Sequence, residues 1–176
     1  MIHGASGGVG IPALQWAKNA GLVVIGTASS EEGRKLVKEH GAGLVVDHSD
    51  DAHLAEIQEF TGGKGVDIIL EMLANVNLQK DFDVLATFGR IAVVGNRGSL
   101  EFTPRAAMTK DATIYGMTLF NSPQTARDEI HSAIFDGLSK GFFKPVIRTS
   151  IPLAEAARAH HEIIETKSFG KIVLIP

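Results

Sequence analysis

Short apolar runs alternate with longer segments of mixed polarity along most of this chain. A continuous apolar run of a few residues is typical of a strand that is buried on both faces of a parallel sheet. Together with the stub Met1-Ile2, the runs predict six strands. After Met1-Ile2, the other five predicted strands lie at Leu22–Gly26, Leu44–Val46, Val66–Leu70, Ile91–Gly95 and Thr113–Leu119.

The segments between these runs have the spacing of amphipathic helices. Ile11, Leu14 and Ala17 share one face of a helix predicted over residues 9–20. The next helix is predicted to begin at Ser29 and Glu32, which have capping-box spacing. Further helices are predicted through residues 54–60, 75–86, 105–108 and 123–140. Alternating strands and helices indicate a doubly wound α/β fold, a Rossmann domain with strand order 3-2-1-4-5-6.

The pattern changes after residue 143. A strand at 144–147, a helix at 154–165 and a strand at 171–175 are predicted there, and a complete six-stranded sheet has no place for them. We therefore divide the chain into a nucleotide-binding domain, residues 1–143, and a strand-helix-strand segment of another domain, residues 144–176.

A glycine-rich turn joins the first predicted strand to the first helix. Gly4, Gly7 and Gly10 allow a tight turn and a close approach of the backbone to a ligand. Pro12 suits the first helical turn, because a proline there loses no helical hydrogen bond. The free amides of that turn and the helix dipole favour an anion such as a diphosphate.

The amino-acid composition excludes several kinds of functional site. The 176 residues carry a formal net charge of −3 and contain no cysteine. Disulfides, thiolate catalysis and cysteine-ligated zinc are therefore excluded within this sequence. No apolar run approaches the ~20 residues of a membrane span, and we expect a cytoplasmic protein. His160 and His161 are neighbours on a predicted helix and point about 100° apart, so no metal site is expected there.

Five segments together resemble the zeta-crystallin family of zinc-independent NADPH:quinone oxidoreductases, in the medium-chain dehydrogenase/reductase superfamily. The resemblance covers essentially the whole chain. It implies NADPH as the cofactor, a quinone or related conjugated carbonyl as the substrate, and a dimer or tetramer. Members of the family begin with a GroES-like catalytic domain, to which the C-terminal segment returns. The five segments are Gly4–Gly10, Gly26–Glu32, Asp47-His48, Glu71–Leu78 and Val94–Gly98.

The resemblance also implies a set of cofactor contacts but no catalytic acid or nucleophile. The contacts are Ser6, Gly7, Gly8, Val9, Ser29, His48, Asn77, Val94, Gly95, Asn96, Arg97, Met117, Thr118 and Leu119. The second strand ends near Gly26-Thr27 without the carboxylate that usually binds the ribose of NAD, which favours NADP. Arg34 and Lys35 lie a few residues further on, near where relatives often place a basic residue for the 2′-phosphate.

Other functions remain open at this point. A short-chain dehydrogenase would need a Tyr-x-x-x-Lys pair, but the single tyrosine, Tyr115, is followed four residues later by Leu119. An enoyl reductase module and a non-catalytic, crystallin-like protein that binds nucleotides or RNA both remain as alternatives. No basic, aromatic-rich surface favours RNA. We expect this chain to bind NADPH but to reduce quinones poorly or not at all.

Overall fold

A computed structural model describes residues 1–166 and 169–176 of the chain. The chain forms two compact units, each built from two separate stretches of sequence. Unit 1 comprises Met1–His3 and His48–Phe135, and unit 2 comprises Gly4–Asp47 and Asp136–Pro176. No helix in the described part of the chain is long and apolar enough to cross a membrane.

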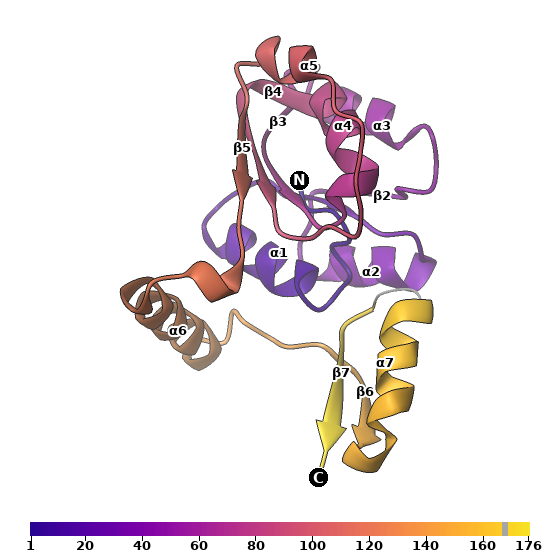
Figure 1. Cartoon of the computed structure of the whole chain (residues 1–176), viewed down its shortest axis with the longest axis vertical. Helices are drawn as coiled ribbons and strands as arrows, with labels where there is room; N and C mark the ends of the chain where they lie inside the picture. Colours follow the sequence, from indigo (N-terminus) through magenta and orange to yellow (C-terminus); the bar gives the residue numbers. More distant parts are fainter. Residues whose placement is uncertain (167–168) are drawn as a thin grey trace. The chain divides into compact units, whose positions relative to one another are not determined.

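The sheet of unit 1 has three parallel strands in the order β3-β4-β5, as Figure 1 shows. Ile2 extends it by an isolated parallel bridge to Leu70, next to hydrogen bonds from His3 N to Leu70 O and from Leu70 N to Met1 O. The strands are β3 (Val66–Glu71), β4 (Leu85–Val93) and β5 (Thr113–Gly116). The helices are α3 (His53–Phe60), α4 (Ala74–Val84), α5 (Pro104–Met108), the 3-10 turn η1 (Leu119–Asn121) and the start of α6 (Gln124–Ser139).

Apolar side chains of the central strands and of α4 form the core of unit 1. Ile69 of β3 and Ile91 of β4 are fully buried, and Phe82 lies on the buried face of α4. Glu71 ends β3 and is also fully buried, although it carries a carboxyl group. A carboxyl group inside an apolar core needs polar partners.

Unit 2 contains the glycine-rich turn and two parallel strands, β1 (Ile25–Thr27) and β2 (Leu44–Val46). The backbone of Ala5 continues this pairing, because its N–H donates to the carbonyl of Thr27 at 2.8 Å. The accompanying helices are α1 (Gly10–Asn19) and α2 (Glu31–Glu39), which bury Leu14 and Val37 respectively.

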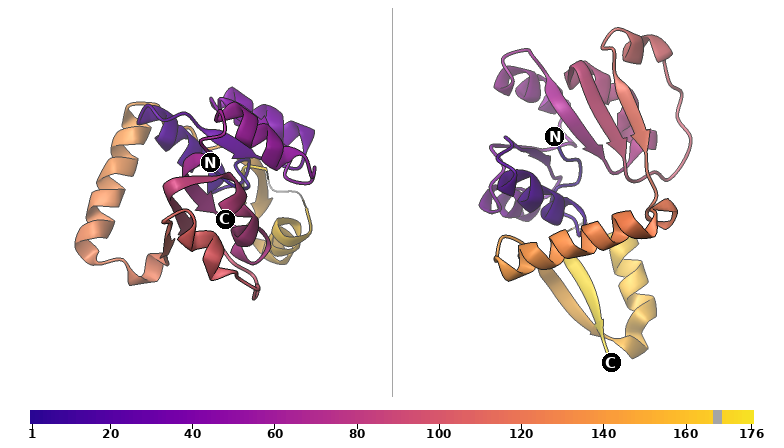
Figure 2. Two further views of the ribbon diagram at one scale, coloured as in Figure 1. Left: turned by 90° about the horizontal axis from the view of Figure 1, so that it is seen from above. Right: turned by 90° about the vertical axis from the view of Figure 1, so that its left-hand side faces the viewer.

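The end of the chain forms a parallel strand pair with a crossover helix, visible in the right-hand view of Figure 2. Its elements are β6 (Ile147–Pro152), η2 (Leu153–Glu155), α7 (Ala156–Glu165) and β7 (Lys171–Ile175). This segment joins the glycine-rich turn within unit 2. Gly170 N donates to Ser6 O at 2.8 Å, and Gly170 also forms a parallel bridge with Gly7.

The α/β fold with parallel strands is confirmed, and β1-β2 and β3-β4-β5 are neighbours as predicted, but several boundaries were wrong. The run that starts at Leu22 becomes a strand only at Ile25, and Val23 is 77% exposed. The predicted strand 113–119 ends at Gly116, and the predicted strand 144–147 lies instead at Ile147–Pro152. Apolar composition marks a candidate strand, but hydrogen-bond partners from elsewhere in the chain decide where it begins and ends.

The cap of α2 also differs from the prediction. Ser30, rather than Ser29, precedes the helix and accepts a hydrogen bond from Gly33 N at 3.1 Å. Both serines offer a suitable oxygen, and the backbone places Ser30 at the capping position.

Candidate functional site

The glycine-rich turn brings the N-terminus of α1 close to the preceding chain. A Cβ placed on Gly10 would lie 2.5 Å from the carbonyl oxygen of Gly4 and 2.6 Å from the Cα of Ala5. Gly4 itself has φ +54°, a backbone conformation that favours glycine. The residue before the helix, Val9, offers no side-chain hydrogen bond to the first turn of α1. The first turn of α1 therefore has no side-chain cap, which is the arrangement seen where a helix start binds an anion.

Lys171, at the start of β7, lies against this turn. A Cβ placed on Gly8 would be 2.9 Å from Lys171 Cγ and 3.1 Å from its Nζ. Among residues 1–166 and 169–176, no ion pair involves Lys171. Its ammonium group therefore adds positive charge beside the amides of the turn.

A pocket of about 240 Å³ lies at the same place in unit 2. Gly8, Val9 and Lys171 line it together with Arg148 and Glu162. Sequence reasoning missed Lys171 because its distance from Gly8 depends on the bridge between Gly7 and Gly170, which spans most of the chain. The only local signal was the pair Gly170-Lys171 in front of the last apolar run.

Arg34 lies against the ends of β1 and β2 in unit 2. Ser29 is the second residue after β1, and Arg34 Nη1 contacts the carbonyl of Ala28, the first residue after β1, at 3.5 Å. The same guanidinium pairs with Asp47 Oδ2 at 2.5 Å, and both side chains remain partly exposed. Asp47, the residue after β2, therefore forms an ion pair with Arg34.

In unit 1, the backbone and side chain of Glu71 hold three of the predicted cofactor residues. Its carbonyl oxygen accepts hydrogen bonds from Val94 N at 2.8 Å and Gly95 N at 3.2 Å. Its Oε1 accepts from Asn77 Nδ2 at 3.1 Å and from Leu73 N. The structure therefore brings Asn77, Val94 and Gly95 together around one residue that the sequence reading did not single out for a role.

Reciprocal side-chain bonds join the turn after β3 to the loop after β4. Asn96 Oδ1 accepts from Asn75 N at 3.0 Å, and Asn75 Oδ1 accepts from Arg97 N at 2.9 Å. Gly95 is required between them, because a Cβ there would lie 2.3 Å from the carbonyl oxygen of Met72. These bonds fix the backbone of Asn96 and Arg97, whose side chains are exposed.

The remaining predicted contacts are divided between the two units, with His48, Met117, Thr118 and Leu119 in unit 1. Met117 N donates to Val93 O at 3.2 Å directly after β5, Thr118 precedes η1, and Leu119 is the first residue of η1. Met117 and Leu119 are 51% and 60% exposed. His48 lies on the surface beyond β2. Ser6, Gly7, Gly8, Val9 and Ser29 belong to unit 2.

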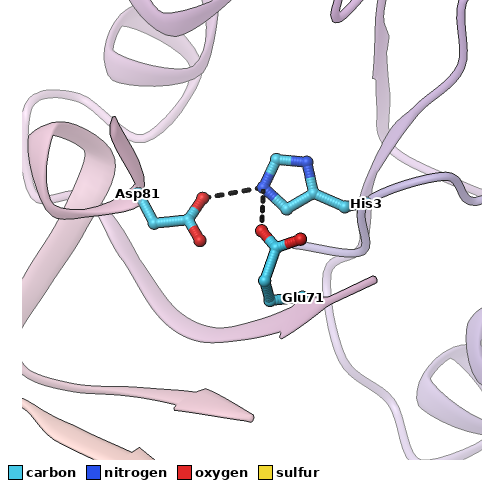
Figure 3. Close-up of side chains that lie close together, drawn as sticks. All are labelled: His3, Glu71 and Asp81. Carbon is cyan, nitrogen blue, oxygen red and sulfur yellow. Dashed lines mark hydrogen bonds and ion pairs between the residues drawn. The ribbon is translucent and has the colours of Figure 1, made fainter. Parts of the chain in front are cut away.

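A buried cluster of titratable groups lies behind Glu71, as Figure 3 shows. His3 Nε2 is 2.7 Å from Asp81 Oδ1 and 3.3 Å from Glu71 Oε2, and all three side chains are buried. Burial raises the pKa of Glu71 to about 6 and that of Asp81 to about 7, and it lowers the pKa of His3. The second oxygens, Glu71 Oε2 and Asp81 Oδ2, have no other hydrogen-bond donor among the described residues. Burial disfavours the charged form of both carboxyl groups, and a proton shared by the pair would supply the missing donor.

A family model described as "Zinc-binding dehydrogenase" matches residues 8–134, which is more than half of the chain. The chain belongs to the zinc-binding dehydrogenase family. Quinone oxidoreductase from Homo sapiens is 44% identical over 99% of this chain and 54% of its own length. 2-Haloacrylate reductase from Burkholderia sp is 30% identical over 100% of this chain and 55% of its own. The chain spans about half the length of the curated relatives that it matches.

Solved structures agree with this family assignment. A mycobacterial protein in complex with NADPH superposes with a TM-score of 0.91 at 28% identity, over 99% of this chain and 56% of the other. Escherichia coli quinone oxidoreductase, also in complex with NADPH, gives a TM-score of 0.89 at 24% identity over 99% and 56%. At that lower identity the second match supports the fold alone.

The family's name refers to zinc, but the described residues of this chain contain no set of side chains that is suited to bind it. Cysteine is absent from the sequence, and His3, Glu71 and Asp81 form the group of potential ligands that lies closest together. Two ligands that bind one tetrahedral zinc at about 2.0–2.1 Å are about 3.3 Å apart. The 2.7 Å contact between His3 and Asp81 is instead a hydrogen bond. These side chains do not fit a zinc site.

Proposed function

We propose that this chain is the NADPH-binding part of a zinc-independent quinone oxidoreductase. The observation that carries the proposal is the glycine-rich turn, where the start of α1 has no side-chain cap and Lys171, which forms no ion pair within residues 1–166 and 169–176, adds positive charge beside the turn. A dinucleotide diphosphate is the ligand with matching charge. Ser6, Gly7, Gly8 and Val9 are its proposed contacts.

The preference for NADPH over NADH rests on the ends of β1 and β2. No carboxylate lies at Thr27, Ala28 or Ser29, where NAD-binding proteins usually place one. Among the described residues, Arg34 is engaged only through Nη1, with Ala28 O and Asp47 Oδ2, so Asp47 is paired and the other N–H groups of the guanidinium remain available to a phosphate. In this proposal, Arg34 supplies positive charge for the adenosine 2′-phosphate, and Ser29 and His48 contact the adenosine portion.

The proposed nicotinamide contacts come from unit 1. The resemblance implies that Val94, Gly95, Asn96 and Arg97 contact the nicotinamide ribose and that Met117, Thr118 and Leu119 contact the carboxamide, and it gives Asn77 as a further cofactor contact. The hydrogen bonds around Glu71 and between Asn75 and Asn96 support this assignment, because they hold the loop backbones in one conformation. These residues bind and orient, and we assign no general acid or nucleophile.

Bound NADPH would supply the hydride for a quinone or related conjugated carbonyl. Relatives named as quinone oxidoreductases and a 2-haloacrylate reductase support this substrate class. Because the chain spans about half of those relatives, we propose that it binds the cofactor but turns over quinones poorly by itself. We further propose a cytoplasmic homo-oligomer that forms through β5, whose residues are exposed.

The test is a fluorescence titration of the 176-residue protein with NADPH and with NADH. Saturable binding with a clear preference for NADPH is expected, and NADPH oxidation with a quinone should be slow. Equal or absent binding of both dinucleotides would refute the cofactor assignment. A salt-dependent RNA shift without any NADPH binding would favour the crystallin-like alternative instead.

A further inference from the structure

Glu71 contacts three proposed cofactor residues without being one of them. Its carbonyl bonds the amides of Val94 and Gly95, and its Oε1 bonds the side-chain amide of Asn77. The carboxylate also accepts a hydrogen bond from the backbone N–H of Leu73, the residue that precedes α4. One fully buried side chain therefore fixes both the start of α4 and the orientation of Asn77.

The orientation of Asn77 depends on this contact. A side-chain amide can turn about its terminal torsion and exchange its donor and acceptor ends. Since Nδ2 donates to Glu71, the carbonyl end of the Asn77 amide is left for another donor. A carboxylate only accepts hydrogen bonds, so it favours the orientation in which Asn77 Nδ2 points toward Glu71. An apolar side chain at position 71 would favour neither orientation of the Asn77 amide.

The cluster behind Glu71 fixes the carboxylate in turn. Its Oε2 faces His3 Nε2 at 3.3 Å, and His3 is held by Asp81 at 2.7 Å (Figure 3). His3 lies directly after the strand residue that bridges to β3, and Asp81 lies on α4. The N-terminal segment and α4 therefore both contribute to holding the carboxyl group at the end of β3, which a helix cap alone would not require.

We propose that Glu71 is a positioning residue for dinucleotide binding: its carboxylate, held by His3 and Asp81, orients the Asn77 amide toward the cofactor. The inference rests on the proposed NADPH-binding function, which it deepens. Glu71 itself contacts no ligand in this scheme, and its effect passes through Asn77.

The test combines a conservative variant with a double-mutant cycle, read out as the Kd for NADPH. Glu71→Gln keeps an acceptor for Asn77 and adds a donor toward Asp81, so the Kd should remain within about threefold of wild type. Glu71→Met has similar length but no acceptor, and it should weaken binding about tenfold. Asn77→Ala should weaken binding by a similar factor.

The Glu71→Met/Asn77→Ala protein distinguishes positioning from a purely structural role. If Glu71 acts through Asn77, adding Glu71→Met to Asn77→Ala changes the Kd by less than about threefold. A general structural defect would instead multiply the two losses to about a hundredfold, which would overturn the proposal. An unchanged Kd in a folded Glu71→Met protein would also overturn it.

A donor–acceptor exchange provides a second readout that does not require Glu71→Met to fold. Asn77→Asp removes the donor, and Glu71→Gln combined with it places an amide donor opposite a carboxylate. The combined variant should recover at least threefold of the affinity that Asn77→Asp loses, and failure to recover would contradict the inference. A wild-type chain that binds no NADPH would overturn the proposed function as well, whereas tight wild-type binding that ignores position 71 would overturn only this inference.

Discussion

The replacement Gly10→Ala tests the close approach of α1 to the glycine-rich turn. The new Cβ would meet three backbone atoms, Gly4 O at 2.5 Å and the Cα and C of Ala5 at 2.6 and 2.7 Å. Ordinary contacts of a Cβ are 3.4 Å or longer, so the turn or the helix must move by about 0.7–0.9 Å. All three atoms belong to the backbone, so the clash cannot be relieved by a change in a side-chain rotamer.

Two opposing effects set the magnitude. Alanine is favoured over glycine in a helix interior by about 1 kcal/mol, and by less at the first position that Gly10 occupies. Overpacking against backbone typically costs about 1–3 kcal/mol. We therefore expect a net loss of about 1–2 kcal/mol in the free energy of unfolding, and a loss of NADPH affinity of at least tenfold because the amides of the turn are displaced.

Urea unfolding and NADPH titration of the same preparations measure both effects. Gly116→Ala is the matched control, since a Cβ there meets nothing within 4 Å and the backbone of Gly116 is not left-handed. It should leave the unfolding free energy within about 0.5 kcal/mol. A Gly10→Ala protein with wild-type stability and wild-type NADPH affinity would refute the close approach.

Three further predictions concern charge. Lys171→Met should weaken NADPH binding about five- to tenfold and reduce its salt dependence, whereas Lys140→Met, at an exposed lysine paired with Asp136, should not; equal salt slopes would contradict the diphosphate assignment. Arg34→Ala should lower the ratio of NADPH to NADH affinity several-fold with little change in the Kd for NADH, and a proportional loss of both would remove Arg34 from phosphate recognition. The raised pKa values of Glu71, about 6, and Asp81, about 7, mean that the folded protein holds protons which the unfolded chain releases above about pH 4. Their contribution to the free energy of unfolding should therefore fall as the pH rises from about 4 to about 7, while the lowered pKa of His3 acts in the opposite sense near pH 6.5. Unfolding titrations of Asp81→Asn, which should show a shallower fall than wild type, check this sign; an identical pH profile would exclude a retained proton.

Much of the candidate site was readable from local sequence. Gly4 and Gly10 occupy positions where a positive φ or a close approach requires glycine, and such requirements arise within a few residues of chain. The motif resemblance also gave Asn77, which lies in the first turn of α4, and the segment from Val94 to Arg97, which follows β4.

Sequence reasoning could not supply the groups that depend on distant partners. Lys171 reaches Gly8 only because β7 follows the bridge to Gly7, and Glu71 gained its role from bonds to His3, Asp81 and Asn77. The apolar pair Leu22-Val23 resembled a buried strand, yet both side chains are more than half exposed. Composition alone could not distinguish them from the buried residues Val24 and Ile25 that follow.

By itself, the sequence determined the alternation of strands and helices, the glycine-rich turn and the absence of cysteine chemistry. These features depend on side-chain periodicity, on backbone freedom at single residues and on composition, so no distant contact is needed to recognise them. The tertiary structure decided which charges lie together, namely Lys171 beside the turn and the buried group of His3, Glu71 and Asp81. Hydrogen bonds and desolvation act over a few ångströms in space. Residues that are distant in sequence, such as Gly8 and Lys171, come within that range only when the strands have paired.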